Sequence, residues 1–180
     1  MSKLFKIFLV LLAIVIAVIG VNSGYHVGRQ ANYPVAYSEF IVKYADEYDL
    51  DPFLVMAVIK VESNFVPEAE SPYAAGLMQL TEETARWNAG KLDIDDYNYL
   101  DPETNIKIGC HYLRHLIDKY GNIDTALAAY NAGMGNVSGW LKNPDYSKDG
   151  TSLKYIPFPE TRAYVDKVND ERDKYRELYG

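Results

Sequence analysis

The most constraining feature of this sequence is a run of apolar residues that ends in an acid. Residues 53–61 are apolar except for Lys60, so the helix that they predict would be buried nearly all round. Asp51 and Pro52 form a typical helix start, because Asp caps free backbone amides and Pro fits the first turn. Glu62 ends the helix, where a carboxylate is costly unless it is paired, neutral or useful. The ordinary alternative is that Glu62 marks the point where the helix reaches water.

The first part of the chain predicts a signal peptide or a membrane anchor. Lys3 and Lys6 precede an uninterrupted apolar run over residues 7–21. As a helix this run would be about 22 Å long, against about 30 Å for the hydrocarbon core of a membrane. No typical cleavage site follows, so we expect an uncleaved anchor with the remainder on the outer, cell-wall side of the membrane; the alternative is secretion after signal cleavage. The expected organisation is an anchor over residues 1–24, a tether over 25–36 and a folded domain over 37–180.

The charge balance of the remainder excludes two classes of ligand. Three of the 18 Lys and Arg residues lie in the first thirty positions and none of the 25 acidic residues does, which leaves 15 basic against 25 acidic side chains. Such an acidic domain argues against nucleic acid and against an anionic membrane surface as partner. The chain has one cysteine, Cys110, so no internal disulfide is possible and the domain must be held together by packing.

Hydrophobic spacing predicts an all-α fold, a compact orthogonal cluster of short helices. Apolar residues recur at helical intervals, and no stretch of useful length alternates with period two. Ser38, Thr81 and Asp101 are candidate N-caps, and Gly121 is a candidate helix end. We expect helices over residues 37–48, 51–63, 81–88, 101–120, 124–132 and 135–141, and one that opens at Pro159 and Glu160, with loops over 64–75, 89–100 and 143–157.

Other chemistries find little support in the sequence. His111 and His115 share one helix face, as a zinc pair would, but no Glu follows His111 and no third ligand stands out. We therefore expect packing or surface histidines, no metal site and no cofactor. Cys110 lies within an apolar stripe and is expected in the core rather than as a nucleophile.

Four short motifs in a fixed order give the sequence its clearest resemblance. They are E-S-N-F at 62–65, S-P followed by A-G-L-M-Q at 71–79, A-A-Y-N-A-G at 128–133 and E-T-R-A-Y-V at 160–165. Together they resemble the transglycosylase SLT domain, the lysozyme-like catalytic domain of soluble-type lytic transglycosylases (glycoside hydrolase family 23, related to goose-type lysozyme). The resemblance implies a lysozyme-like helical domain that cleaves the MurNAc–GlcNAc β-1,4 bond of peptidoglycan and leaves 1,6-anhydro-MurNAc ends.

The resemblance also implies roles for particular residues. It makes Glu62 the sole catalytic acid/base, with Ser71 near its carboxyl and able to hydrogen-bond it. The substrate-binding residues that it implies are Ser71, Gly76, Leu77, Met78 and Gln79 of the sugar groove, Tyr130 and Asn131 of the same cleft, and Glu160 and Tyr164 near the substrate or the cleft floor.

The chemistry implied by the resemblance needs a protonated Glu62. This group would donate its proton to the leaving oxygen, the substrate's 2-acetamido group would stabilise the developing positive charge, and the muramic C6 hydroxyl would then close on C1. Desolvation against Phe65, Met78 and Tyr130 is expected to raise the pKa of Glu62, so that an essential acid titrates at about 6–7.

Two other functions remain open at this point. A hydrolytic lysozyme would use water in the same cleft and would need a second carboxylate, for which Asp93, Asp95 and Asp96 are the candidates. A non-catalytic wall-binding module would have no need for Glu62. The expected partners are peptidoglycan glycan strands, and the membrane through the N-terminal helix, with no nucleic acid, and the protein is expected to be a monomer.

Overall fold

The computed structural model describes residues 33–95 and 97–180, and every regular element within these ranges is an α-helix. Between them the backbone forms isolated bridges from Ala75 to Glu70 and to Leu80. The predicted anchor and most of the predicted tether lie outside the described residues. Within the described ranges, no helix is long and apolar enough to cross a membrane. The helices are α2 (Ser38–Glu47), α3 (Pro52–Glu62), α4 (Glu82–Lys91), α5 (Pro102–Tyr120), α6 (Ile123–Ala132), α7 (Met134–Leu141) and α8 (Pro159–Tyr179).

The polar residues before three helices act as the sequence predicts. The side chains of Asp51, Thr81 and Asp101 each accept a hydrogen bond from a backbone amide in the first turn of the helix that follows. Gly121 ends α5 in the left-handed conformation with a φ of 62°, which costs glycine little. These confirmed caps explain why α3, α4 and α5 begin at the expected residues.

Two details of the prediction are wrong. Ser38 is not a cap, because the capping position is taken by Tyr37, with a φ of 60° and no side-chain hydrogen bond. Helix α4 continues to Lys91 instead of ending near Asn88. Asn88 favours this extension, since it is fully buried, donates to Thr84 O at 2.8 Å and meets His111 Nδ1 at 2.7 Å. Tertiary contacts therefore override its weak intrinsic helix preference.

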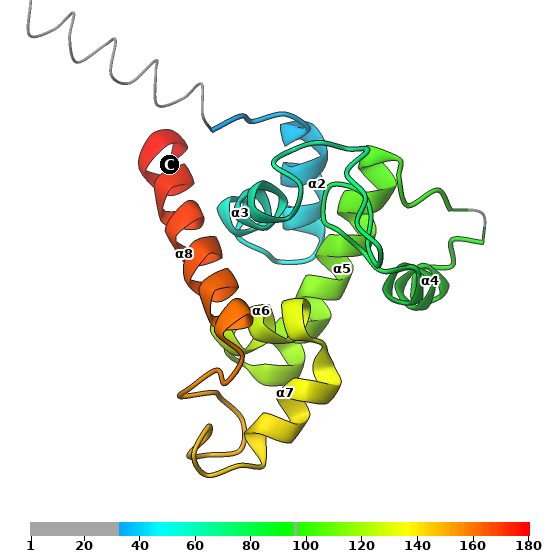
Figure 1. Cartoon of the computed structure of the whole chain (residues 1–180). Coiled ribbons are helices and arrows are strands. Elements are labelled where there is room, and N and C mark those ends of the chain that lie inside the picture. Colours follow the sequence, from blue (N-terminus) through cyan, green and yellow to red (C-terminus); the bar gives the residue numbers. More distant parts are fainter. Residues whose placement is uncertain (1–32, 96) are drawn as a thin grey trace, which may run out of the picture. The chain divides into compact units, whose positions relative to one another are not determined.

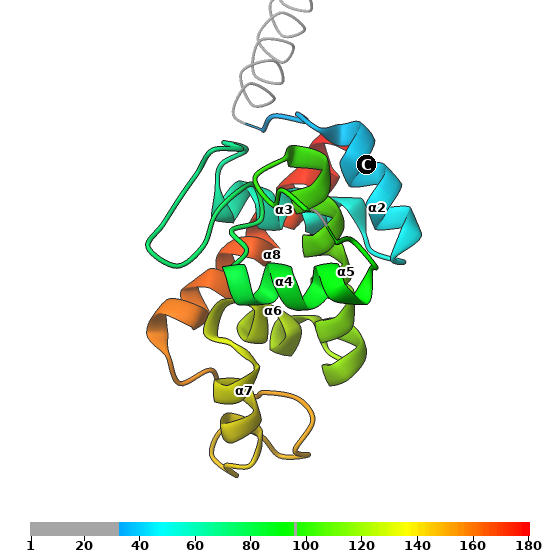
Figure 2. The same ribbon diagram turned by 90° about the vertical axis from the view of Figure 1, so that its right-hand side faces the viewer.

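Helix α3 is the buried centre of the domain, as its composition predicts. Six consecutive residues, Leu54–Ile59, are buried. Its most extensive helix–helix contact is with α8, which lies alongside it in Figures 1 and 2. Arg176 near the end of α8 pairs with Asp51 at the start of α3, so the two helices are joined by a charged contact as well as by apolar packing. This pairing brings residues near opposite ends of the described chain into contact.

Helix α5 carries the rest of the domain. It contacts α2, α4 and α6, and α6 in turn packs against α7 and α8. Cys110 on α5 is fully buried and unpaired, as predicted. Gly109 allows a close approach, because a Cβ atom there would lie 2.3 Å from the sulfur of Met78. Helix α5 thus supports the loop that carries Met78.

We expect the Asp101 cap to contribute measurably to stability. Asp101→Ala removes the acceptor for the backbone amide and the hydroxyl of Thr104, both within 3.0 Å, and should cost about 1 kcal/mol of unfolding free energy. Chemical denaturation would measure this loss. Asp101→Asn keeps an acceptor at the same place and should retain most of the stability; an equal loss in both variants would show that the cap is not the cause.

Candidate active site

Glu62 is the last residue of α3 and is half-buried where the helix meets α8. Burial raises the pKa of its carboxyl to about 7, while a hydrogen-bonding interaction with Tyr164 and the charge of Lys167 act in the opposite direction. The direction and the main cause are those predicted, since desolvation favours the neutral acid. At neutral pH about half of these carboxyls hold a proton.

Tyr164 and Lys167 are three residues apart on α8, so they project from the same side of that helix. The Tyr164 hydroxyl is buried and forms no hydrogen bond of normal geometry with the described residues, yet it lies close enough to Glu62 to lower the pKa of the carboxyl. Burial and the nearby Glu62 raise the pKa of Tyr164 in return. The structure therefore brings together Glu62 and Tyr164, two of the residues singled out by sequence, and adds Lys167, which sequence reasoning missed.

Tyr130 on α6 also lies close to Glu62. Burial, and secondarily the charge of Glu62, raise the pKa of the Tyr130 hydroxyl. That hydroxyl donates to Met78 O at 2.8 Å. Of the three side chains predicted to desolvate Glu62, Tyr130 is therefore the one that has an evident interaction with it. The ring of Phe65 packs against Tyr175 of α8, with centroids 6.3 Å apart, and Met78 packs against α5.

The turn at residues 76–79 differs from its predicted role. Leu77 and Met78 are fully buried, so their side chains belong to the core and do not line a groove. Gly76 is also buried, with a φ of +82° and no room for a Cβ, which would lie 2.2 Å from Asn105 Nδ2. Gln79 is half-buried, and its side-chain amide donates to Ala69 O at 2.8 Å and to Gly76 O at 3.0 Å. The motif thus shapes a rigid turn, and Gln79 is its accessible polar member.

Two buried polar residues fix this turn, and sequence reasoning did not assign them that role. Asn105 on α5 is fully buried; it accepts from the Met78 amide at 2.8 Å and donates to Tyr99 O at 2.7 Å and to Ala75 O at 3.3 Å. The hydroxyl of Ser63 lies 2.8 Å from Leu77 O, its nearer acceptor. Met78 O accepts a hydrogen bond from the Tyr130 hydroxyl. The hydrogen bonds of Asn105 and Ser63 that fix the turn therefore also set the position of Tyr130. A polar residue in an apolar helix stripe is the sequence signal that points to Asn105.

Three other predicted site residues lie at the surface. Ser71 is exposed, and its hydroxyl bonds to the backbone of Ala74, accepting at 3.0 Å and donating at 3.1 Å, so it does not bind the Glu62 carboxyl as implied. Asn131 is exposed and accepts a hydrogen bond from Thr161 at 2.8 Å, which links the end of α6 to the start of α8. Glu160 is exposed in the first turn of α8, where the helix dipole stabilises a carboxylate.

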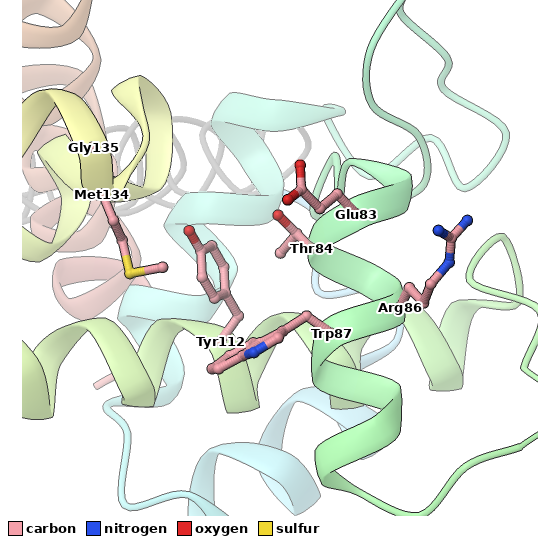
Figure 3. A pocket seen from close by; sticks show the side chains of 7 residues that line it. All are labelled: Glu83, Thr84, Arg86, Trp87, Tyr112, Met134 and Gly135. Atoms are coloured by element: carbon pink, nitrogen blue, oxygen red, sulfur yellow. The ribbon is translucent and has the colours of Figure 1, made fainter.

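A groove of about 590 Å³ lies between α4, α5 and α7, and none of the residues predicted for the site lines it. Figure 3 shows Trp87, Tyr112 and Met134 turned toward the space between these helices. The ring of Tyr112 also contacts Tyr130, with centroids 5.4 Å apart, so the groove adjoins the surroundings of Glu62. Its lining residues are Glu83, Thr84, Arg86, Trp87, Tyr112, Met134 and Gly135.

The two histidines considered as metal ligands have other partners. His111 bonds to Asn88, and His115 packs against Trp87, with ring centroids 4.9 Å apart. Within the described ranges no group of three or more His, Cys, Asp or Glu side chains is arranged to hold a metal ion. Around Glu62 the described residues place the hydroxyls of Tyr130 and Tyr164, an arrangement that can support proton transfer by the Glu62 carboxyl.

Comparison with known proteins gives a consistent assignment for this arrangement. The family model of the transglycosylase SLT domain matches residues 39–152. The soluble lytic murein transglycosylase of Salmonella typhimurium is 37% identical over 158 residues, which cover 84% of this chain and 24% of that protein. The membrane-bound lytic murein transglycosylase C of Edwardsiella ictaluri is 30% identical over 183 residues, covering 85% of this chain and 49% of that protein. The chain thus spans between a quarter and a half of the length of these relatives.

Solved structures give the same result. The crystal structure of the 70 kDa soluble lytic transglycosylase of Escherichia coli superimposes with a TM-score of 0.72 and 34% identity, over 82% of this chain and 25% of that one. A complex of the 70 kDa soluble lytic transglycosylase with bulgecin A also superimposes with a TM-score of 0.72, at 32% identity, over 88% of this chain and 29% of that one. The all-helical domain therefore has the fold of these enzymes.

Replacing Asn105 should destabilise the turn at residues 76–79. Asn105→Leu leaves the buried Met78 amide and the Tyr99 carbonyl without their partner, while Ala75 O keeps the Leu80 amide, and we expect a loss of about 2–4 kcal/mol of unfolding free energy. Chemical denaturation measures this. Asn136→Ala is the matched control, because Asn136 is exposed and donates to the carbonyl one turn earlier in the chain; a similar loss in both variants would contradict the proposed fastening.

Lys167 should tune the acidity of Glu62. Lys167→Met removes a positive charge that favours the carboxylate, so the pKa of Glu62 should rise above about 7. Carbon-13 NMR titration of the Glu62 carboxyl carbon measures the change directly. Lys142→Met removes an equal charge beyond α7 and should leave the titration unchanged. An unchanged or lowered pKa of Glu62 in Lys167→Met would contradict the effect ascribed to the Lys167 charge.

Proposed function

As this chain belongs to the transglycosylase SLT domain family, we propose that it is a peptidoglycan lytic transglycosylase. It cleaves the MurNAc–GlcNAc β-1,4 bond without water and leaves 1,6-anhydro-MurNAc ends. The observation that carries this proposal is one half-buried carboxyl, Glu62, whose pKa of about 7 keeps a proton available at neutral pH. The names of its relatives, soluble and membrane-bound lytic murein transglycosylases, support the same substrate and reaction.

In the first step Glu62 acts as general acid. Its proton passes to the glycosidic oxygen as the bond to C1 of the muramic sugar breaks, and the 2-acetamido group of that sugar stabilises the positive charge at C1. The carboxylate left behind is more stable than burial alone would allow, because the Tyr164 hydroxyl and the Lys167 ammonium both favour the charged form. These two groups thus stabilise the charge that develops during the step.

In the second step Glu62 acts as general base. It takes the proton of the C6 hydroxyl of the same sugar, and the C6 oxygen bonds to C1 to close the anhydro ring. This returns Glu62 to its protonated state. An internal hydroxyl competes well with water, since well-oriented groups reach effective molarities of about 10⁵ M or more.

The single-carboxyl scheme accords with the surroundings of Glu62. A hydrolase would need a second carboxylate to position water. Of the loop acids considered for that role, Asp93 and Asp95 are exposed to solvent, and Asp96 lies outside the described residues. The groups that affect the pKa of Glu62 are instead a phenol and an ammonium, which suit an acid that alternates between its two protonation states.

For the glycan we propose contacts with the polar residues that the family resemblance assigns to the cleft, and of these Tyr130 has an interaction with Glu62. They are Gln79, Tyr130 and Asn131, with Ser71 and Glu160. Gln79 and Tyr130 are held by backbone hydrogen bonds, and Asn131 by Thr161, so their geometry is set before substrate arrives. The buried side chains of Leu77 and Met78 support the turn, and Met78 O accepts the hydrogen bond of the Tyr130 hydroxyl.

We also propose that residues 1–24 anchor the protein and that residues 25–36 connect the anchor to a monomeric catalytic domain on the wall side of the membrane. The apolar run over 7–21 behind Lys3 and Lys6 supports an anchor with its lysines inside. That a relative of similar sequence is named as membrane-bound accords with this placement.

The decisive experiment is digestion of purified peptidoglycan by the full-length chain, followed by mass spectrometry. We expect fragments with anhydro-muramyl ends, 18 mass units lighter than the hydrolysis products because one water is not added. Glu62→Gln keeps the shape of the side chain and removes its acidity, so cleavage should fall by at least about a thousandfold. Reducing ends would indicate a hydrolase, and unchanged cleavage by Glu62→Gln would move the chemistry elsewhere. Absence of cleavage by the unmodified chain, with retained wall binding, would indicate a binding module.

A further inference from the structure

The groove between α4, α5 and α7 contains a carboxylate without a cationic partner. Glu83 lines the groove from the first turn of α4 and forms no ion pair with a described residue. Its neighbour Glu82 is already paired with Arg86, and Figure 3 shows the Arg86 side chain extending away from Trp87 and Tyr112. Two charged residues, Glu83 and Arg86, line the groove, and Glu83 is the one whose charge is not matched by an ion pair with a described residue, within a domain that has an excess of acids.

Three other residues that line the groove are aromatic or apolar: Trp87, Tyr112 and Met134. Trp87 is 41% exposed and has two partners: His115 packs against its ring, and the Lys91 ammonium lies 5.9 Å from the ring centroid, which shows that the indole can accept a cation. Tyr112 is 8% exposed, and its hydroxyl, which points into the groove in Figure 3, forms no hydrogen bond with the described residues. Met134 faces both rings from α7. A carboxylate beside aromatic faces is the combination that attracts an ammonium group.

Peptidoglycan offers one such group. Its sugars are neutral, and its stem peptides carry carboxylates together with the free amine of a diamino acid. Glu83 would repel the carboxylates and attract the amine, so charge decides between the two. The contact of Tyr112 with Tyr130 places the groove next to the catalytic surroundings, within reach of a stem on the strand being cut.

We propose that this groove binds the free ammonium group of a peptidoglycan stem peptide, with Glu83 as its counter-ion and Trp87 and Tyr112 as its aromatic walls. The proposal rests on the proposed function, because it assumes peptidoglycan as substrate. It has a consequence for where the enzyme cuts. Cross-linking acylates the stem amine and removes its charge, so the groove favours strands whose stems are not yet cross-linked.

The test caps the amine chemically and removes its partner by mutation. Uncross-linked peptidoglycan strands are used as prepared and after acetylation of their amines with acetic anhydride, and the full-length chain acts on both. We expect capping to lower kcat/KM by about fivefold for the unmodified chain, equal to about 1 kcal/mol. Glu83→Gln should act on both substrates equally, at about the rate that the unmodified chain shows on capped strands.

The matched control is Glu39→Gln. Glu39 is also exposed and is also the second residue of its helix, α2, so this variant makes the same change in net charge away from the groove. It should retain the fivefold preference. Equal rates of the unmodified chain on both substrates, or a preference that survives Glu83→Gln, would overturn the proposal.

Trp87→Leu separates an ammonium site from a sugar site. It keeps apolar bulk but removes the aromatic face, so an ammonium site predicts a smaller preference for uncapped strands. A loss of rate that is equal on both substrates, with the preference unchanged, would instead assign the groove to a neutral sugar. Failure of the proposed function itself would be distinct, because anhydro products would then be absent or would persist in Glu62→Gln.

Discussion

Removal of one carboxyl group from water is the constraint on which the site depends. The pKa of Glu62 rises from 4.5 to about 7, so keeping this group ionised inside the fold costs roughly 3 kcal/mol. The folded state holds the proton more tightly than the unfolded chain does. The contribution of Glu62 to stability is therefore greatest below about pH 4.5 and is lost as the pH rises through about 7. That cost is a large part of the about 5–15 kcal/mol that a typical domain has in total, and the packing of α3 against α8 must offset it.

Rigidity around this carboxyl comes from buried hydrogen bonds rather than from groups that touch it. Asn105 and Ser63 hold the turn at 76–79 through its backbone, and the turn then offers Met78 O to the hydroxyl of Tyr130. An aromatic residue beside Glu62 is thus positioned by an amide on another helix. Buried polar networks of this kind are stable when every member is satisfied, and they fix one geometry among the several that an apolar core would permit.

The helices, and the place of Glu62 at the end of a buried one, could be predicted from the sequence because their causes are local, whereas the catalytic role proposed for Glu62 came from the family resemblance. A cap such as Asp101 lies next to the amides that it serves, and the apolar run before Glu62 can be recognised without a partner. Local reasoning failed for Ser38, whose place is taken by a tyrosine in the left-handed conformation. For Leu77 and Met78 it was the family resemblance that implied a groove lining, whereas both side chains face the core. Which side of a turn meets solvent depends on distant residues. Lys167 and the groove beside Trp87 were missed for that reason, since they exist only once separate helices are assembled.

The proximity of Glu62 to α8 has a consequence for when the surroundings of this carboxyl are complete during folding. The carboxyl lies early in the domain, whereas Tyr164 and Lys167 come from the helix that closes it, far later along the chain. A ribosome or a translocation channel releases α3 first, and long-range contacts of this kind form slowly and late. Until α8 docks, Glu62 lacks the two groups of that helix, Tyr164 and Lys167, that stabilise its carboxylate. On the proposed function, a chain in which α8 has not yet docked therefore has an incomplete site, and the site is complete only once this helix is in place.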